Sequence, residues 1–228
     1  MRLRRVVVVI VSLVGFGVII LAATPPVAEQ VNKKTQPISI HTEPSGSAAK
    51  LLETLVVKGR APKTNYSRSQ FGSGWSTTNG CDTRNIILHR DLQSPVLDEA
   101  CSVISGTLND PYTGLVITFS KGSSDIQIDH VVALSNSWQT GAQGLTRTQR
   151  IQLANDPLEL LAVQGAANQQ KSDGDAATWV PSNKSFRCEY VARQIAVKNK
   201  YGLWVTPAEK QAILQVLDSC PEQTLPSR

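Results

Sequence analysis

The chain contains 228 residues, with 23 lysines and arginines against 18 acidic residues, which gives a formal charge of +5. It has only three histidines, His41, His89 and His130, so metalloenzyme motifs that need several clustered histidines are excluded. The length allows one domain of ordinary size with its own hydrophobic core.

The first 28 residues predict an export signal or an N-terminal membrane anchor. The basic start MRLRR precedes residues 6–23, which are apolar or small except for Ser12. A secreted form and an extracellular form anchored through this segment therefore both remain open. The segment holds three arginines and no acid, so its removal lowers the formal charge from +5 to +2, and charge alone is weak evidence for a nucleic-acid partner.

The four cysteines predict two disulfides, because thiols in an exported chain are usually oxidised. We favour Cys81 with Cys101 and Cys188 with Cys220 among the three pairings, since each would close one local segment. A structural zinc site is the competing interpretation, but no two cysteines have the close spacing that such sites use.

The first half of the domain is predicted to combine one helix with short strands. Residues 29–46 resemble a flexible spacer, and residues 47–228 form the folded domain. Apolar residues at helical spacing from Ser47 predict a helix that stops at Gly59, followed by an irregular loop to Gly80. Strands are expected at 86–88 and 115–119.

The second half alternates strands and helices. Residues 125–130 predict a strand with His130 and Asp129 on opposite faces, so both can face one substrate only if the strand ends or twists there. A capping box at Thr146 predicts a helix to about Ala154. A strand at 158–163, a short helix at 166–171 and two longer helices at 186–200 and 207–218 complete the prediction.

Asp129 and His130 are the strongest candidates for chemistry. The carboxylate can offer a hard oxygen to a divalent cation, and the imidazole can accept a proton near neutral pH. His41 lies in the spacer, and for His89 a structural hydrogen bond is the simpler interpretation.

Six motifs follow one another along the domain: CDTRN at 81–85, RDL at 90–92, IDHVVAL at 128–134, NDPL at 155–158, NxxKxDxD at 168–175 and WVP at 179–181. In this order they resemble the HNH, or ββα-metal (His-Me finger), endonuclease family, and most of all its exported bacterial members. The resemblance implies an α+β fold in which two short antiparallel strands and a helix form the core of a mainly helical, disulfide-bonded domain.

The resemblance also implies roles for individual residues. Asp129 and Asn168 would coordinate one Mg²⁺ or Mn²⁺ ion, and His130 would be the general base. Lys171 and Arg84 would contact phosphate. The family asparagine that steadies the histidine loop has no direct match, so this orienting role is divided between Asn155 and Glu159.

The expected activity is metal-dependent hydrolysis of DNA, and less favourably RNA, with low sequence specificity by a monomer. Two other functions remain open. Glu159 at the usual asparagine position would suit an inactive surface module that binds polyanions or cell wall. A glycosidase using Asp125 and Asp129 would need a raised pKa on one of these acids. Arg90 with Asp91, and separately Asp173 and Asp175, are expected to brace loops.

Overall fold

The computed structural model describes residues 45–226, which belong to one compact unit. The N-terminal segment 1–28 and the spacer up to residue 44, both named above, lie outside the described residues. Within residues 45–226, each helix is too short or too polar to span a lipid bilayer.

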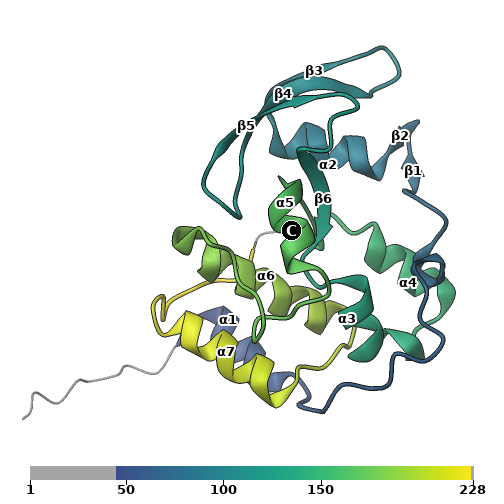
Figure 1. The fold of residues 1–228 in the computed structure, drawn as a ribbon. Helices are drawn as coiled ribbons and strands as arrows, with labels where there is room; N and C mark the ends of the chain where they lie inside the picture. The colour runs from purple at the N-terminus through teal and green to yellow at the C-terminus, as the bar shows by residue number, and fades with distance from the viewer. Residues whose placement is uncertain (1–44, 227–228) are drawn as a thin grey trace, which may run out of the picture. The chain divides into compact units, whose positions relative to one another are not determined.

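The described residues form a mixed fold of helices and antiparallel sheets (Figure 1). The α-helices are α1 (Ser47–Thr54), α2 (Thr83–Asp91), α3 (Leu134–Gln139), α4 (Arg147–Ala154), α5 (Gly165–Lys171), α6 (Arg187–Lys200) and α7 (Pro207–Leu217). The strands are β1 (Thr77–Thr78), β2 (Cys81–Asp82), β3 (Gln93–Leu97), β4 (Val103–Asn109), β5 (Val116–Ser120), β6 (Ile126–His130) and β7 (Leu160–Gln164). Short 3₁₀ turns occur at η1 (Arg68–Phe71), η2 (Ala142–Gly144) and η3 (Lys184–Phe186).

The centre of the fold is the antiparallel pair β6–β7, which continues directly into α5. Its register pairs Asp129 with Leu161 and His130 with Leu160. Alternate residues of β7 belong to different hydrophobic cores: Leu160 and Ala162 to a smaller one, Leu161 and Val163 to a larger one. Burial on both faces explains why β7 is a nearly continuous apolar run.

The turn from β7 into α5 depends on a glycine. A Cβ atom on Gly165 would lie 2.4 Å from the backbone oxygen of Ser124, and the amide of Gly165 donates to the carbonyl of Asp125 at 2.7 Å. Only a residue without a side chain allows this approach between the start of α5 and the chain entering β6.

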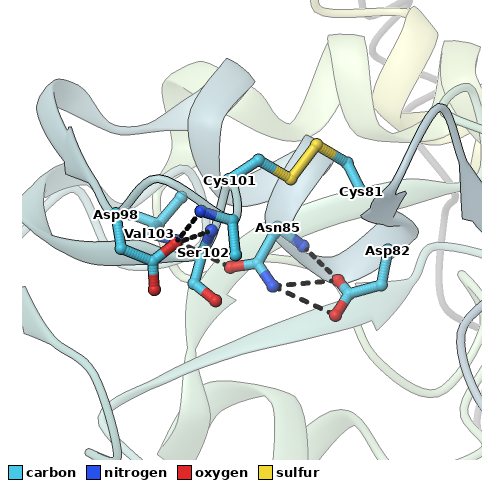
Figure 2. Close-up of a disulfide and its surroundings, with 8 residues drawn as sticks. Cys81, Asp82, Asn85, Asp98, Cys101, Ser102 and Val103 are labelled. Carbon is cyan, nitrogen blue, oxygen red and sulfur yellow. Dashed lines mark hydrogen bonds between the residues drawn. A yellow bond between two sulfur atoms is a disulfide. The ribbon is translucent and has the colours of Figure 1, made fainter.

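The smaller core lies between α2 and the three-stranded sheet β3–β4–β5 (Figure 1). The disulfide Cys81–Cys101 joins the chain entering α2 to the turn before β4, as predicted. Figure 2 shows Asn85 beside this disulfide, where its side chain donates to Asp82 and accepts from the amide of Val103 at 2.8 Å. The start of α2 is thus attached to β4 by one covalent and one polar link.

The larger core contains α1, α6 and α7, together with the inner faces of α3 and α4. The predicted disulfide Cys188–Cys220 is confirmed and links the start of α6 to the chain after α7. Lys198 and Glu209 form an ion pair of 2.8 Å in which neither side chain is exposed. Both predicted capping boxes, at Thr146 and Thr206, are present.

Several predicted elements were wrong. Residues 86–88 lie inside helix α2, because the Asp82 side chain accepts from the amide of Asn85 and caps this helix. The first helix ends at Thr54 rather than near Gly59, since Val57 pairs with Val205 in an isolated bridge. Strands β3 and β4 and helix α3 were missed, and their polar and small residues gave no clear periodicity.

Replacing Gly165 with alanine is expected to lower the free energy of unfolding by roughly 1–3 kcal/mol, the usual range for forcing extra atoms into a packed site. Urea denaturation of the oxidised domain measures this. Gly144→Ala is the matched control, because a Cβ there meets nothing within 4 Å. Equal stability of the two variants would show that the close approach of Gly165 to Ser124 does not exclude a side chain at position 165.

Candidate active site

A cavity of about 660 Å³ opens where β6 ends beside α5. Its wall is polar and combines groups from four parts of the chain. The residues relevant to chemistry are Gln127, Asp129 and His130 of β6, Asn168 of α5, Arg84 of α2, and Lys63, Tyr66, Arg68 and Trp75 from the segment before α2. Asp129 and His130 are consecutive residues of β6, and both line this cavity.

The imidazole of His130 is held in one orientation. Its Nε2 lies 3.0 Å from the carbonyl oxygen of Ala154, the last residue of α4. Because a carbonyl oxygen can only accept, Nε2 carries the proton and Nδ1 keeps its lone pair. Trp75 stacks on the ring with a centroid distance of 5.7 Å and an interplanar angle of 9°.

The surroundings of His130 keep the ring neutral. Burial, together with the positive charge of Arg68, lowers the pKa of His130 to about 3. At neutral pH the ring is an unprotonated base whose free nitrogen is Nδ1.

Asp129 is buried and hydrogen-bonded through both oxygens. Lys171 donates to Oδ1 at 3.0 Å, and the Tyr112 hydroxyl donates to Oδ2. Burial raises the pKa of Asp129 above its usual value, while the charge of Lys171 and the hydrogen bond from Tyr112 oppose this rise. These two donors fix the orientation of the carboxyl group.

Asn168 lies on the side of α5 that faces β6. Its Nδ2 donates to Oε1 of Gln127 at 2.9 Å, which leaves its carbonyl oxygen as the group able to bind a ligand. Gln127 and Asp129 share one face of β6, as the alternation predicted. Among the residues that line the cavity, Asp129 and Asn168 thus offer a carboxylate and an amide oxygen as hard donors, a type of ligand that fits Mg²⁺ or Mn²⁺.

Within residues 45–226, no group of three or more His, Cys, Asp or Glu side chains could hold a metal ion. Asp129 and Asn168 are the residues of this cavity that could hold a divalent ion, with water and phosphate oxygens as the other ligands. Soft transition metals prefer nitrogen and sulfur donors, so this donor set favours hard cations.

The position of Lys171 does not fit the phosphate contact expected from the sequence. Its side chain is completely buried, and its ammonium donates to Asp129 and to the backbone carbonyl of His130, the latter at 2.8 Å. A buried ammonium that already pairs with a carboxylate cannot reach a phosphate without breaking these bonds. Lys171 instead orients Asp129.

Glu159 and Asn155 lie on two sides of the histidine loop. The Glu159 carboxyl accepts from the amide of Val132 at 3.2 Å, two residues after His130. Asn155 accepts from the amide of Ser76 at 2.8 Å and so anchors the chain next to Trp75. Glu159 contacts the loop directly, whereas Asn155 contacts the backbone of Ser76, the residue after Trp75.

The other candidates have clear positions. Arg84 lies at the cavity, where its guanidinium is 3.4 Å from the carbonyl of Ile126. Arg90 pairs with Asp91, and both bond the backbone of β7. Asp173 and Asp175 were expected to brace the loop after the short helix, and they also pair with Lys63 and Arg60 of the segment before α2. His89 is exposed on α2 and lies outside the cavity.

The glycosidase hypothesis has no geometric support. Asp125 is exposed and bonds Ser123, and it does not line the cavity that contains Asp129. Two carboxyl groups across one sugar-binding cleft are therefore not brought together by these residues.

Comparison with known proteins places the domain in a nuclease family. Residues 82–216 match the family described as GmrSD restriction endonucleases, C-terminal domain. The chain belongs to this family. The matched span holds Arg84, Asp129, His130, Asn168 and Lys171, so the cavity's candidate ligands and base all lie within the GmrSD C-terminal domain.

A fungal relative extends the likeness beyond this domain. The chain is 41% identical over 181 residues to an "Uncharacterized secreted protein" of Arthroderma benhamiae, which covers 78% of this chain and 87% of that protein. No solved structure matches the chain. Because the relative is fungal, it gives no support to a specifically bacterial type.

Four cavity residues from the segment before α2 were not predicted as functional: Lys63, Tyr66, Arg68 and Trp75. All precede the span matched by the GmrSD C-terminal family, and they come from a loop without periodicity. The available signal was the mixture of basic and aromatic residues in KTNYSR at 63–68. Tyr112 was also missed, since nothing in the sequence links it to Asp129.

Glu159→Gln is expected to stabilise the protein more at pH 8 than at pH 5. Burial raises the pKa of Glu159 well above its usual value, so the folded state retains a proton that the unfolded state loses above about pH 4.5. Stability of the wild type therefore falls as pH rises towards the folded pKa, by about 1.4 kcal/mol per pH unit. Glutamine has no such proton and keeps an oxygen for the amide of Val132.

Urea denaturation at both pH values tests this. An equal effect of the substitution at pH 5 and pH 8 would mean that Glu159 is ionised in the folded state.

Proposed function

We propose that this protein is an exported, metal-dependent endonuclease that hydrolyses phosphodiester bonds of DNA, and less readily RNA, with low sequence specificity. One observation carries the proposal: the Ala154 carbonyl fixes the proton of His130 on Nε2, and His130 lines a cavity together with Asp129 and Asn168. The order of β6, β7 and α5 supports the ββα-metal core that the sequence resemblance implies.

His130 acts as the general base in this proposal. Its neutral imidazole takes a proton from the attacking water through Nδ1, while the Ala154 carbonyl stabilises the charge that develops on the ring. Asp129 and Asn168 would hold a Mg²⁺ or Mn²⁺ ion, which when bound neutralises charge on the scissile phosphate and the leaving oxygen. Lys171 and Tyr112 keep Asp129 oriented, and Arg84 offers a guanidinium to phosphate.

Export is supported by three observations. The N-terminal 28 residues have the pattern of an export signal, the described domain contains two disulfides, and the fungal relative is named as secreted. We propose a secreted monomer acting on nucleic acid outside the cell. The N-terminal segment would be its membrane contact if it is not cleaved.

The polyanion-binding alternative arose from Glu159 at the position of the family asparagine. The Glu159 carboxyl contacts the amide of Val132 and so holds the histidine loop. The departure from asparagine therefore does not require the loss of a steadying contact, and the enzyme remains the better-supported function.

Replacing His130 with alanine is expected to lower plasmid cleavage at least about 100-fold, because general-base catalysis contributes at least this factor. The assay uses oxidised protein with Mg²⁺ or Mn²⁺, and with chelator in parallel. His89→Ala is the matched control, since His89 is exposed and outside the cavity. Cleavage by His130→Ala at the rate of His89→Ala would eliminate His130 as the base.

Replacing Asn168 with alanine is expected to raise the metal concentration for half-maximal cleavage at least about tenfold, since even indirect partners of a metal contribute this much to affinity. Asn168→Asp should retain metal binding because it keeps an oxygen donor. Asn199→Ala, exposed near the end of α6, controls for a lost amide. An unchanged metal requirement in Asn168→Ala would remove Asn168 from the ligand set.

A further inference from the structure

Arg68 differs from the other arginines of residues 45–226 in having no hydrogen-bond partner there. The remaining arginines donate to carboxylates or carbonyl oxygens; they are Arg60, Arg84, Arg90, Arg147, Arg150, Arg187 and Arg193. Arg68 is exposed, yet it lines the candidate active-site cavity and, with His130 and Trp75, a smaller cavity of about 180 Å³ beside it. An unpaired guanidinium at a cavity is a ready partner for an anion.

The segment that carries Arg68, residues 60–75, is fixed at several points. Arg60 pairs with Asp175 at 2.7 Å, and the indole nitrogen of Trp138 donates to the carbonyl of Thr64 at 3.2 Å. The η1 turn packs against α4, where Arg150 donates to the carbonyl of Gln70 at 3.0 Å. The segment is therefore a built wall of the cavity, and Arg68 is presented from ordered backbone.

Arg68 and Arg84 lie towards opposite ends of β6. Arg84 is beside the carbonyl of Ile126, the first residue of the strand, while Arg68 shares a cavity with His130, the last. Four residues of extended chain separate these ends, which corresponds to about 13 Å. The guanidinium of Arg68 is thus next to the candidate base His130, and the guanidinium of Arg84 lies farther along the same cavity.

We propose that Arg68 and Arg84 bind the phosphates on the two sides of the scissile linkage, so that the substrate is an internal stretch of a nucleic-acid strand. This inference rests on the proposed function, because it names the substrate of the same cavity. It predicts that linkages with phosphates on both sides are preferred to terminal linkages and to small diesters. Arg68 is a binding residue for the flanking phosphate and does not touch the reacting phosphorus.

We call Arg68 and Arg84, as the proposed partners of the two flanking phosphates, the arginine clamp. Binding without metal tests the clamp separately from catalysis. The probe is a fluorescent single-stranded DNA 12-mer in chelator, titrated at several salt concentrations with the full oxidised protein. Arg68→Ala should weaken binding at least about tenfold. It should also reduce the slope of log K against log salt concentration by about 0.7, the value for one phosphate contact on a single strand. Arg68→Lys should keep the slope. Lys50→Ala, an equal loss of charge on the exposed face of α1, should change little.

The double variant Arg68→Ala/Arg84→Ala should lose about 1.4 from the slope, because two separate phosphates are released. Equal behaviour of Arg68→Ala and Lys50→Ala would overturn the proposal. So would a double variant with the slope of either single variant, since the two arginines would then share one phosphate.

Cleavage provides the second readout. With metal, Arg68→Ala should cut the 12-mer at least about tenfold more slowly, with a much smaller loss of rate on bis(p-nitrophenyl) phosphate, which has no flanking phosphate. Parallel losses on both substrates would place Arg68 at the reacting phosphate and overturn the clamp. If wild type binds the 12-mer through Arg68 but cuts nothing with any metal, the clamp stands and the proposed nuclease activity fails.

Discussion

The ammonium group of Lys171 joins the strand and the helix that carry the candidate metal ligands. It donates to the Asp129 carboxyl and to the carbonyl of His130, with its side chain wholly buried. Two charges removed from water are tolerated only where hydrogen bonds satisfy them, and Tyr112 supplies a further bond to Asp129. Because this one group contacts consecutive residues of β6, it fixes α5 against the strand, and Asn168 lies about one helical turn before Lys171 in α5.

The position of the cavity follows from the two hydrophobic cores. Strand β7 sends alternate side chains into each core, so β7 is buried on both faces, and the cavity lies along β6, where Gln127, Asp129 and His130 line it. The GmrSD C-terminal region provides the base and the candidate ligands there. Segment 60–75, outside that region, adds Trp75 against the imidazole and Arg68 at the rim. The matched region alone therefore forms an incomplete cavity.

Prediction from the sequence succeeded where the signal was local and strong. Strand β6, helix α4 and helix α7 each have alternation or a capping box within a few residues. It failed at residues 86–88, where a β-branched run suggested a strand but the Asp82 cap and packing against β4 made a helix. The phosphate role expected for Lys171 also failed, because the motif gave its spacing from Asn168 but not its burial.

The sequence by itself determined the local chemistry of this protein: the Asp129–His130 pair at a strand end, Asn168 at a helix start and cysteines spaced for two local disulfides. These features depend on neighbours along the chain. The tertiary structure decided which nitrogen of His130 is free, since Ala154 lies 24 residues away, and it decided that Lys171 is buried while Arg68 has no partner within the described residues. Tautomer, desolvation and pairing depend on groups that meet only when distant segments pack together.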